Sequence, residues 1–256
     1  TGVEWRREHG NVTHNLSNQP WYTDYFLSYG LDYGGTQEVL EGYGELNVPV
    51  FKDWALGRYL ELDGAIRATH NKASGTAGVN AGLSRSHSFA TWKVSGIWDL
   101  TDWLRFRATR SRDVRAAQFR ELFQSYNVTS GGPFGTVANP WGGSASDFAN
   151  ITTGGDINLK PEKADTWTVG AVVAPKDGFL SRFRFSADWY QIKLKGAIVG
   201  PPFGVGAQNI VGQCKQELDA GVPDGPFCSR ITGANTPDII AINNTAANLQ
   251  GFTTRG

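Results

Sequence analysis

Hydrophobic and polar residues alternate most regularly over residues 183–190, which read Phe-Arg-Phe-Ser-Ala-Asp-Trp-Tyr. Successive side chains of a strand point to opposite faces, so this run predicts a strand with one aromatic and one polar face. Residues 166–174 repeat the pattern, with apolar side chains at Trp167, Val169 and Val173. Residues 175–181 between them contain the turn sequence Lys-Asp-Gly. We therefore expect an antiparallel hairpin.

The same alternation predicts about eight strands along the chain, each with one apolar and one polar face. The expected strands cover residues 2–10, 36–50, 57–70, 88–100, 103–109, 166–174 and 183–190, with another starting within 244–256. Residues 206–220 have helical spacing instead.

The connections between these strands alternate between short and long. The short ones are residues 51–56, 101–102 and 175–181, and the long ones are residues 11–35, 71–87, 124–157 and 200–243. Because successive strands reverse direction, the short turns lie at one end of the sheet and the long loops at the other. This is the layout of an outer-membrane β-barrel with short periplasmic turns and long extracellular loops. A soluble β-sandwich is the alternative, but it does not predict sorted loop lengths.

The cost of burying charge in lipid predicts which face of a barrel points inward. A Lys or Arg facing lipid at mid-membrane costs about 2–4 kcal/mol. We therefore expect the charged face to line the interior, with Glu45, Glu61, Asp63, Arg67, Lys93, Arg105, Arg107, Arg184 and Asp188. The opposite face would meet lipid through Trp5, Trp92, Trp98, Phe106, Trp167, Phe183, Phe185 and Trp189.

Composition limits the class of protein. The 256 residues hold 24 basic and 24 acidic side chains, so nothing indicates nucleic-acid binding. No run of about 18 apolar residues predicts a membrane-spanning helix, and the alternating strands of a barrel produce no such run. The chain contains no Met and shows no signal peptide. We interpret it as an internal piece of a longer chain.

Cys214 and Cys228 lie close together in a Gly- and Pro-rich stretch. A disulfide closing a loop of about 15 residues contributes roughly 3 kcal/mol and requires an oxidising compartment. Two reduced thiols are the alternative. The four histidines show no ligand spacing near the cysteines, so we expect neither a metal site nor a cofactor. Carboxylates are spread over strand interiors, and no pair can be named as catalytic acid and base, so we expect no enzyme.

Five segments resemble TonB-dependent outer-membrane receptors. Residues 111–123, SRDVRAAQFRELF, resemble the family's S-R-x-x-R-A-P-x-L-x-E-L-F barrel segment, with Ala117 and Phe119 as departures. Residues 158–164, NLKPEKA, resemble N-L-K-P-E-x-S/A. The other three are EGYGELNVP at 41–49, YQIKLKGAI at 190–198 and NLQGFTTRG at 248–256. They occur in the family's order, and their signature residues are Arg115, Glu121, Leu122, Pro161 and Glu162.

The resemblance implies an all-β, antiparallel transmembrane β-barrel of about 22 strands, filled by an N-terminal plug. Residues 1–256 would supply about eight of those strands, and neither the plug nor the TonB box. The implied function is active import of a scarce nutrient such as a siderophore, a vitamin or an oligosaccharide. TonB, with ExbB and ExbD, would act through the plug. The implied location is the bacterial outer membrane, in contact with lipid and lipopolysaccharide, with extracellular loops and with a surface lipoprotein as a further possible partner.

Ligand contacts in such a receptor would come from aromatic residues of the loops: Tyr126, Phe134, Trp141, Phe148 and Phe203. Packing between loops is the alternative role for each of them. Arg115 and Glu121 fit a structural ion pair at the barrel rim, and a functional role is the alternative. Two other functions stay open: a passive porin-like barrel, and a soluble secreted β-sandwich that binds a ligand or acts as a glycosidase.

Overall fold

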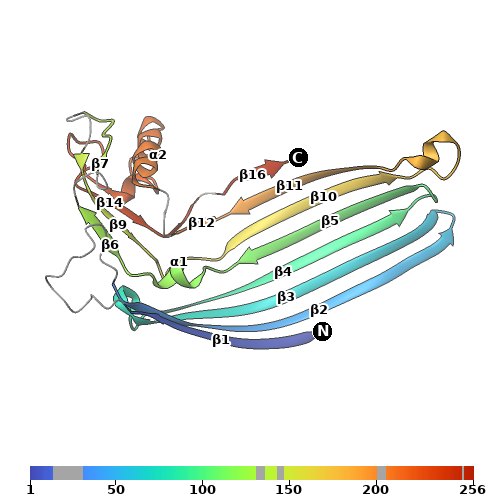
Figure 1. Ribbon diagram of the computed structural model, residues 1–256, viewed down its shortest axis with the longest axis horizontal. Helices are drawn as coiled ribbons and strands as arrows, with labels where there is room; N and C mark the ends of the chain where they lie inside the picture. The colour runs from blue at the N-terminus through green and yellow to red at the C-terminus, as the bar shows by residue number, and fades with distance from the viewer. Residues whose placement is uncertain (14–30, 131–135, 143–146, 201–205, 250) are drawn as a thin grey trace.

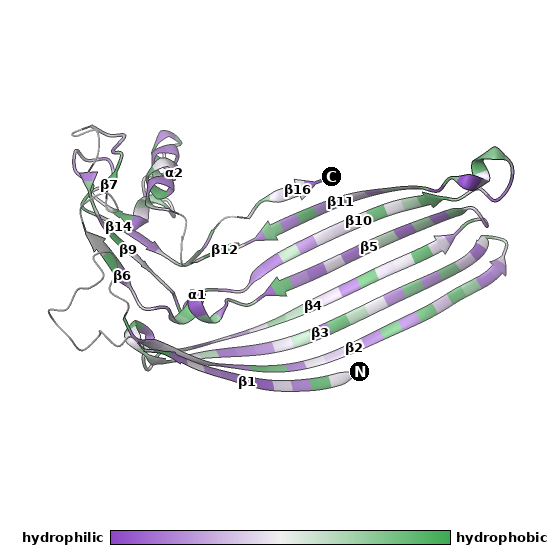
Figure 2. Ribbon diagram, viewed as in Figure 1, coloured by the Kyte–Doolittle hydropathy of each residue, from purple (hydrophilic) through white to green (hydrophobic). Residues whose placement is uncertain are grey.

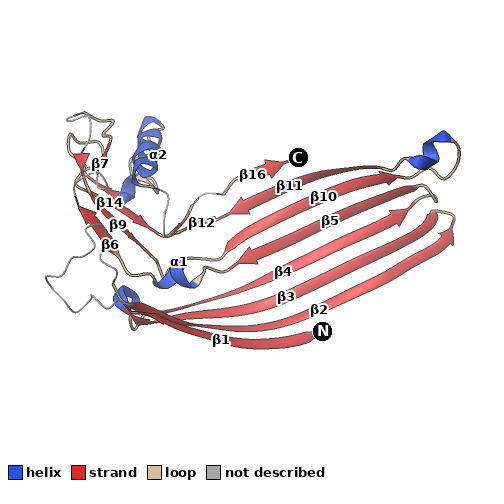
Figure 3. Ribbon diagram, in the orientation of Figure 1, coloured by secondary structure: helices blue, strands red, loops and turns tan. Residues whose placement is uncertain are grey.

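The computed structural model describes residues 1–13, 31–130, 136–142, 147–200, 206–249 and 251–256. Long strands form one extended sheet, most of the short elements gather at one end of it, and a short helix lies at the other end (Figures 1 and 3). The long strands are β1 (Gly2–Val12), β2 (Tyr33–Trp54), β3 (Gly57–Ala77), β4 (Ser84–Asp99), β5 (Leu104–Arg115), β10 (Glu162–Val173) and β11 (Phe185–Lys195), and the short β16 (Thr253–Arg255) completes the sheet.

The shorter elements lie between these strands in sequence. The helices are η1 (Gly78–Asn80), α1 (Phe119–Phe123), η3 (Phe179–Arg182), α2 (Ala207–Asp219) and η4 (Cys228–Arg230). The short strands are β6 (Asn127–Ser130), β7 (Thr136–Val137), β8 (Asp147–Phe148), β9 (Asn150–Gly154), β12 (Ile198–Val199), β13 (Ile231–Thr232), β14 (Ala241–Thr245) and β15 (Ala247–Asn248).

The large sheet has eight strands in the order β1-β2-β3-β4-β5-β10-β11-β16. Every neighbouring pair is antiparallel. The expected number of strands and the expected hairpin, now β10–β11, are confirmed. The order follows the sequence, as in a barrel wall built strand by strand.

The two faces of this sheet differ in polarity over most of its area. In β5, Phe106 lies opposite Ala171 of β10, whereas Arg107 lies opposite Gly170. Apolar and polar positions alternate in this way along the part of the long strands nearer the tight turns, as Figure 2 shows. On the apolar face large side chains are exposed, among them Leu46, Leu62, Ile66, Val94, Trp98, Phe106, Trp167, Val169, Phe185 and Trp189. Such an exposed apolar surface is typical of a face that meets lipid.

One expected loop is wrong. The Gly, Ser and Asn content of residues 71–87 predicts a loop, but β3 continues to Ala77 and β4 begins at Ser84. The ladder between them continues through the pair Lys72–Ser86. The connection spans only residues 78–83, so it is shorter than the 174–184 connection at the opposite end. Loop lengths are therefore not strictly sorted between the two ends.

Several other boundaries differ from the expected ones. Strand β11 begins at Phe185, so Phe183 and Arg184 precede it, and the one-turn helix η3 occupies part of the preceding connection. Strand β5 extends to Arg115 because polar side chains continue the ladder with β10. The expected helix within 206–220 is confirmed as α2.

The end of the sheet opposite the tight turns carries a small separate layer of structure, which we call the loop unit (residues 116–161 and 196–249 where described). It contains the sheet β13-β14-β9-β6, the pairs β7–β8 and β12–β15, and helix α2. Strands β9 and β14, far apart in sequence, pair in parallel. Two apolar clusters stabilise this end: one within the loop unit, around Ile210 and Ile242, and one where the loop unit joins the sheet, around Phe123 and Ile157.

Candidate functional site

Helix α2 packs on β14 and β7 of the loop unit because one of its faces is apolar. Ile210, Val211 and Cys214 are fully buried against β14 and β7, and Leu218 packs at the edge of the same cluster. This spacing of one, four and eight residues places all four side chains on one side of a helix. A disulfide joins Cys214 to Cys228 of η4, so the segment that follows the helix is covalently fixed to it.

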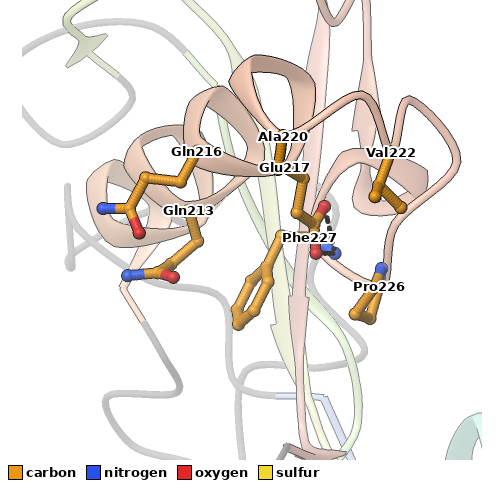
Figure 4. Close-up of a pocket in the computed structure, with 7 residues that line it drawn as sticks. All are labelled: Gln213, Gln216, Glu217, Ala220, Val222, Pro226 and Phe227. Carbon is orange, nitrogen blue, oxygen red and sulfur yellow. Dashed lines mark hydrogen bonds between the residues drawn. The ribbon is translucent and has the colours of Figure 1, made fainter.

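The carboxylate of Glu217 also holds this segment. It accepts a hydrogen bond from the backbone amide of Phe227 (3.1 Å), as Figure 4 shows. It accepts another from the backbone amide of Cys228 (2.9 Å). A cavity of about 270 Å³ lies beside it, lined by Gln213, Gln216, Glu217, Ala220, Val222, Pro226 and Phe227. Because Glu217 is already engaged, the polar groups left for a ligand here are the amides of Gln213 and Gln216.

The family-like segment at the end of β5 forms a junction between the sheet and the loop unit. The guanidinium of Arg115 donates to Glu162 at 2.6 Å and to Glu121 of α1 at 3.0 Å. Glu121 also accepts from the amide of Gln118 in a capping box that starts α1. Glu162 in turn accepts from the amide of Ile198 at 2.8 Å. Leu122 is buried beneath these contacts, and Pro161 precedes β10. These signature residues therefore connect the ends of β5 and β10 to the loop unit through hydrogen bonds and ion pairs.

The expected interior charges share one face of the sheet and are largely paired. Arg105 contacts Asp99, and Arg107 contacts Asp188 on β11. Arg67 pairs with Glu41, a residue that the sequence reasoning missed. Asp63 accepts from Asn47 at 3.2 Å, and Tyr59 donates to Glu61.

A cavity of about 130 Å³ opens among residues of this same face. It brings Glu45, Arg67 and Lys93 together with Tyr43 and Asp113. Arg184, the remaining expected interior charge, lies outside strand pairing. The polar face thus presents both signs of charge, with Glu45 and Lys93 available beside paired groups.

The expected ligand-binding aromatics are in different environments. Phe148 is 70% exposed, whereas Trp141 packs against the apolar cluster of the loop unit. Tyr126 is partly covered, and this burial, together with nearby Asp156, raises the pKa of its phenol, which stays neutral. Phe134 and Phe203 lie outside the described residues. Phe148 and Tyr126 are therefore the candidates whose rings remain accessible.

Two polar residues of the loop unit were not expected: Asp147, which is buried, and Arg230, which is half-buried. Asp147 accepts hydrogen bonds from Asn139 (2.8 Å) and from the amide of Ile239 (2.7 Å). Arg230 donates to the carbonyls of Asn243 and Thr245, both at 3.1 Å, and burial lowers the pKa of its guanidinium. Neither residue belongs to a periodic pattern, so no signal in the sequence identified them.

The described ranges lack two kinds of feature. No group of three or more His, Cys, Asp or Glu side chains that could hold a metal ion occurs in the part of the chain with described structure. None of the helices placed by the structure is long and apolar enough to cross a membrane.

The large antiparallel sheet has one apolar face and one face of paired charges. At one end it carries the disulfide-linked loop unit. These features define the outer-membrane β-barrel class. A model of the family "TonB dependent receptor-like, beta-barrel" matches residues 1–252, and the chain belongs to that family. This family implies an outer-membrane location. The comparison with curated proteins found no match.

Three solved structures are similar to the chain. They are the siderophore receptor PirA from Acinetobacter baumannii (14% identity, TM-score 0.45), a mutant of the ferric enterobactin receptor PfeA from Pseudomonas aeruginosa (16%, 0.38) and the siderophore receptor PirA from Pseudomonas aeruginosa (11%, 0.35). The matches cover 99%, 88% and 88% of this chain. The chain spans only 38%, 33% and 39% of the length of those structures.

Proposed function

We propose that the chain forms part of the wall and the outer mouth of a receptor that imports a scarce nutrient across the outer membrane with energy from TonB. The observation that carries this proposal is the family match over residues 1–252. The paired charges of the inner face support it, because they keep a wide interior polar and suited to contact with a plug. The family is a transport family, so we propose no enzymatic activity.

The receptor would bind its nutrient at the loop unit, on the extracellular side, and TonB would act with ExbB and ExbD through the plug. The nutrient would be a siderophore, a vitamin, an oligosaccharide or a similar molecule, and a surface lipoprotein is a further proposed partner.

To test this proposal, strains with and without the receptor gene are grown with iron, cobalamin or oligosaccharide as the limiting nutrient. We expect growth on one of these nutrients to depend on the gene and to be lost when TonB is removed. Uptake that survives without TonB would identify a passive porin instead.

We also propose that residues 1–256 are a partial barrel domain and that the remaining strands and the plug lie elsewhere in the same protein. Among the described residues, both outer strands of the sheet, β1 and β16, have one unpaired edge, and unpaired edges are costly in lipid. The intact mass of the detergent-extracted protein, measured under denaturing conditions, tests this. We expect a mass well above the 27.8 kDa of this chain. A mass near that value would contradict the proposal.

Phe148 is the residue that we propose for ligand contact, because its ring is the most exposed of the described candidates. Stacking on an aromatic ring contributes roughly 1 kcal/mol. F148A is therefore expected to weaken nutrient binding by about fivefold. F179A is the matched control, since Phe179 is 78% exposed in η3 at the opposite end of the sheet. If F148A and F179A bind the nutrient with equal affinity, Phe148 does not contact it.

A further inference from the structure

The cavity beside α2 combines two kinds of surface. One side is formed by the uncharged side-chain amides of Gln213 and Gln216 (Figure 4). The other side is formed by Val222 and Pro226, which are exposed and apolar. The ring of Phe227 also lines the cavity and packs in part against the apolar cluster of the loop unit. A ligand here meets hydrogen-bonding groups and apolar contacts side by side.

The apolar side of the cavity is fixed before any ligand binds. The amide of Val222 donates to the carbonyl of Glu217 at 2.8 Å, and the disulfide links Cys228 to the helix. Gly225 lies so close to the carboxylate of Glu217 that a Cβ at this position would collide with it. Because a rigid wall lowers the entropy cost of binding, the cavity is a preformed site. Its volume of about 270 Å³ suits a small ligand or one end of a larger ligand.

The cavity offers no cation to a ligand. Among the described residues that line it, none is Lys, Arg or His, and Glu217 is the only acid. The carboxylate of Glu217 already accepts the amides of Phe227 and Cys228. On the same helix, Lys215 is paired with Asp219 at 2.8 Å. A phosphate or carboxylate in the cavity would be repelled by Glu217 without a compensating cation, so the site disfavours anionic ligands.

The side-chain amides of Gln213 and Gln216 match the hydrogen-bonding pattern of a peptide group. Each of them presents an acceptor oxygen beside a donor nitrogen, and a peptide group presents the complementary N–H and carbonyl. In the ranges that the structure describes, neither side-chain amide has a hydrogen-bond partner. The two residues are three positions apart on α2, so their side chains are neighbours on one side of the helix. Together they can hold the backbone of a peptide-like ligand.

The apolar side of the cavity disfavours a sugar. A sugar ring carries hydroxyl groups on most of its carbon atoms. Hydroxyls placed against Val222 or Pro226 would lose their water without gaining a hydrogen-bond partner, which is unfavourable. An apolar side chain in the same place gains from the contact. The cavity therefore favours a ligand with an amide group beside an apolar group.

We infer that the cavity binds an uncharged, peptide-like segment, with peptide groups on Gln213 and Gln216 and an apolar side chain on Val222. This inference rests on the proposed function, because it names the chemistry of the part of the nutrient that enters the loop unit. The segment is either a free short peptide or a peptide-like part of a larger nutrient. Both sources present the same uncharged amides and apolar side chain to the cavity.

The test uses the complete receptor, purified in detergent. The probes are the tripeptide Leu-Ala-Leu with an acetylated amino end and an amidated carboxyl end, maltotriose, and inorganic phosphate. Binding at millimolar concentration is measured by saturation-transfer NMR. We expect saturable transfer to the leucine methyl groups, none to maltotriose, and no displacement of the tripeptide by phosphate. Q213A/Q216A removes the hydrogen bonds of both amides and is expected to weaken tripeptide binding about tenfold.

The control is K215A/D219A, which removes two exposed polar side chains of the same helix that do not line the cavity. It should bind the tripeptide as the unaltered receptor does. Alanine at exposed helix positions favours the helix, so both variants should keep the fold of α2. Absence of saturable tripeptide binding, tighter binding of maltotriose, displacement by phosphate, or unchanged affinity in Q213A/Q216A would overturn the inference.

Uptake by living cells separates the two sources of the segment. A free peptide nutrient should support receptor-dependent growth on the tripeptide as nitrogen source. A larger peptide-like nutrient should instead be blocked from uptake by the tripeptide, which then supports no growth. Either result supports the inference. Because the NMR assay needs no TonB, tripeptide binding with TonB-independent uptake refutes the proposed function alone, whereas TonB-dependent uptake without tripeptide binding refutes this inference alone.

Discussion

At the scale of single residues, Arg115 joins three segments that are distant in sequence. Its guanidinium contacts Glu162 at the start of β10 and Glu121 in α1, and Glu162 fixes the amide of Ile198. Removing one partner from a largely buried charge group leaves the others without compensation. Arg115 thus couples the outer end of the sheet to two different loops.

We predict that R115A destabilises the protein by about 2 kcal/mol, because two carboxylates lose their cation in a partly covered position. The hydrogen exchange of the Ile198 amide should become faster. R58A serves as control, since Arg58 bridges Asp53 and Asp102 at the opposite end, where all three side chains are about half exposed. Unchanged exchange at Ile198 in R115A would show that the junction is held by packing alone.

Gly75 supports a second prediction, which concerns the lack of room for a side chain at this position. A Cβ at this position would lie 1.9 Å from the carbonyl oxygen of Asn80, so the end of the β3–β4 hairpin would have to move. Asn80 donates to the carbonyl of Leu122 at 2.9 Å, and that bond would be lost. G75A is expected to cost about 2 kcal/mol, visible as a lower thermal midpoint. G42A, with nothing within 4 Å of its Cβ, should leave the midpoint unchanged or slightly higher.

At the scale of elements, the sequence predicted strands only where their two faces differ in polarity. Along β10, apolar Trp167, Val169 and Val173 alternate with polar neighbours, and the hairpin was correct. The outer part of β4 is polar on both faces, and the outer part of β3 has only the small side chains Ala73 and Ala77 as apolar positions, so no period is visible. In this outer part, the register of the β3–β4 ladder follows from the pairing of the same two strands nearer the tight turns. The parallel pair β9–β14 depends on contacts between distant segments and was not predictable from local pattern.

The disulfide of the loop unit supports a prediction about local opening. Cys214 and Cys228 are 14 residues apart, and losing such a link costs about 3 kcal/mol in the chain-entropy model. C214S/C228S should therefore lower the hydrogen-exchange protection of α2 amides by about two orders of magnitude. Amides of β5 should keep their protection, because the large sheet does not contain the link. Equal protection of α2 in both proteins would mean that Glu217 and the apolar cluster suffice.

The ligand-binding candidates were the least predictable part of the site. An aromatic ring in a loop suits many ligands, but the sequence does not show whether that ring packs against its neighbours or stays exposed. In the structure Phe148 is exposed, whereas Trp141 packs against the apolar cluster of the loop unit. Asp147 and Arg230 follow from the tertiary fold and have no local signature.

At the scale of the whole molecule, the central claim is that the apolar face of the sheet meets lipid and the charged face encloses a polar interior. The most direct test is a spin label at single introduced cysteines along β4 of the complete receptor in membranes, at Val94 and Trp98 on one face and at Lys93 and Ser95 on the other. Oxygen concentrates in hydrocarbon, and a nickel chelate stays in water. We predict faster relaxation by oxygen at positions 94 and 98 and by the nickel chelate at 93 and 95. The reverse pattern, or access of the chelate to all four positions, would contradict the account.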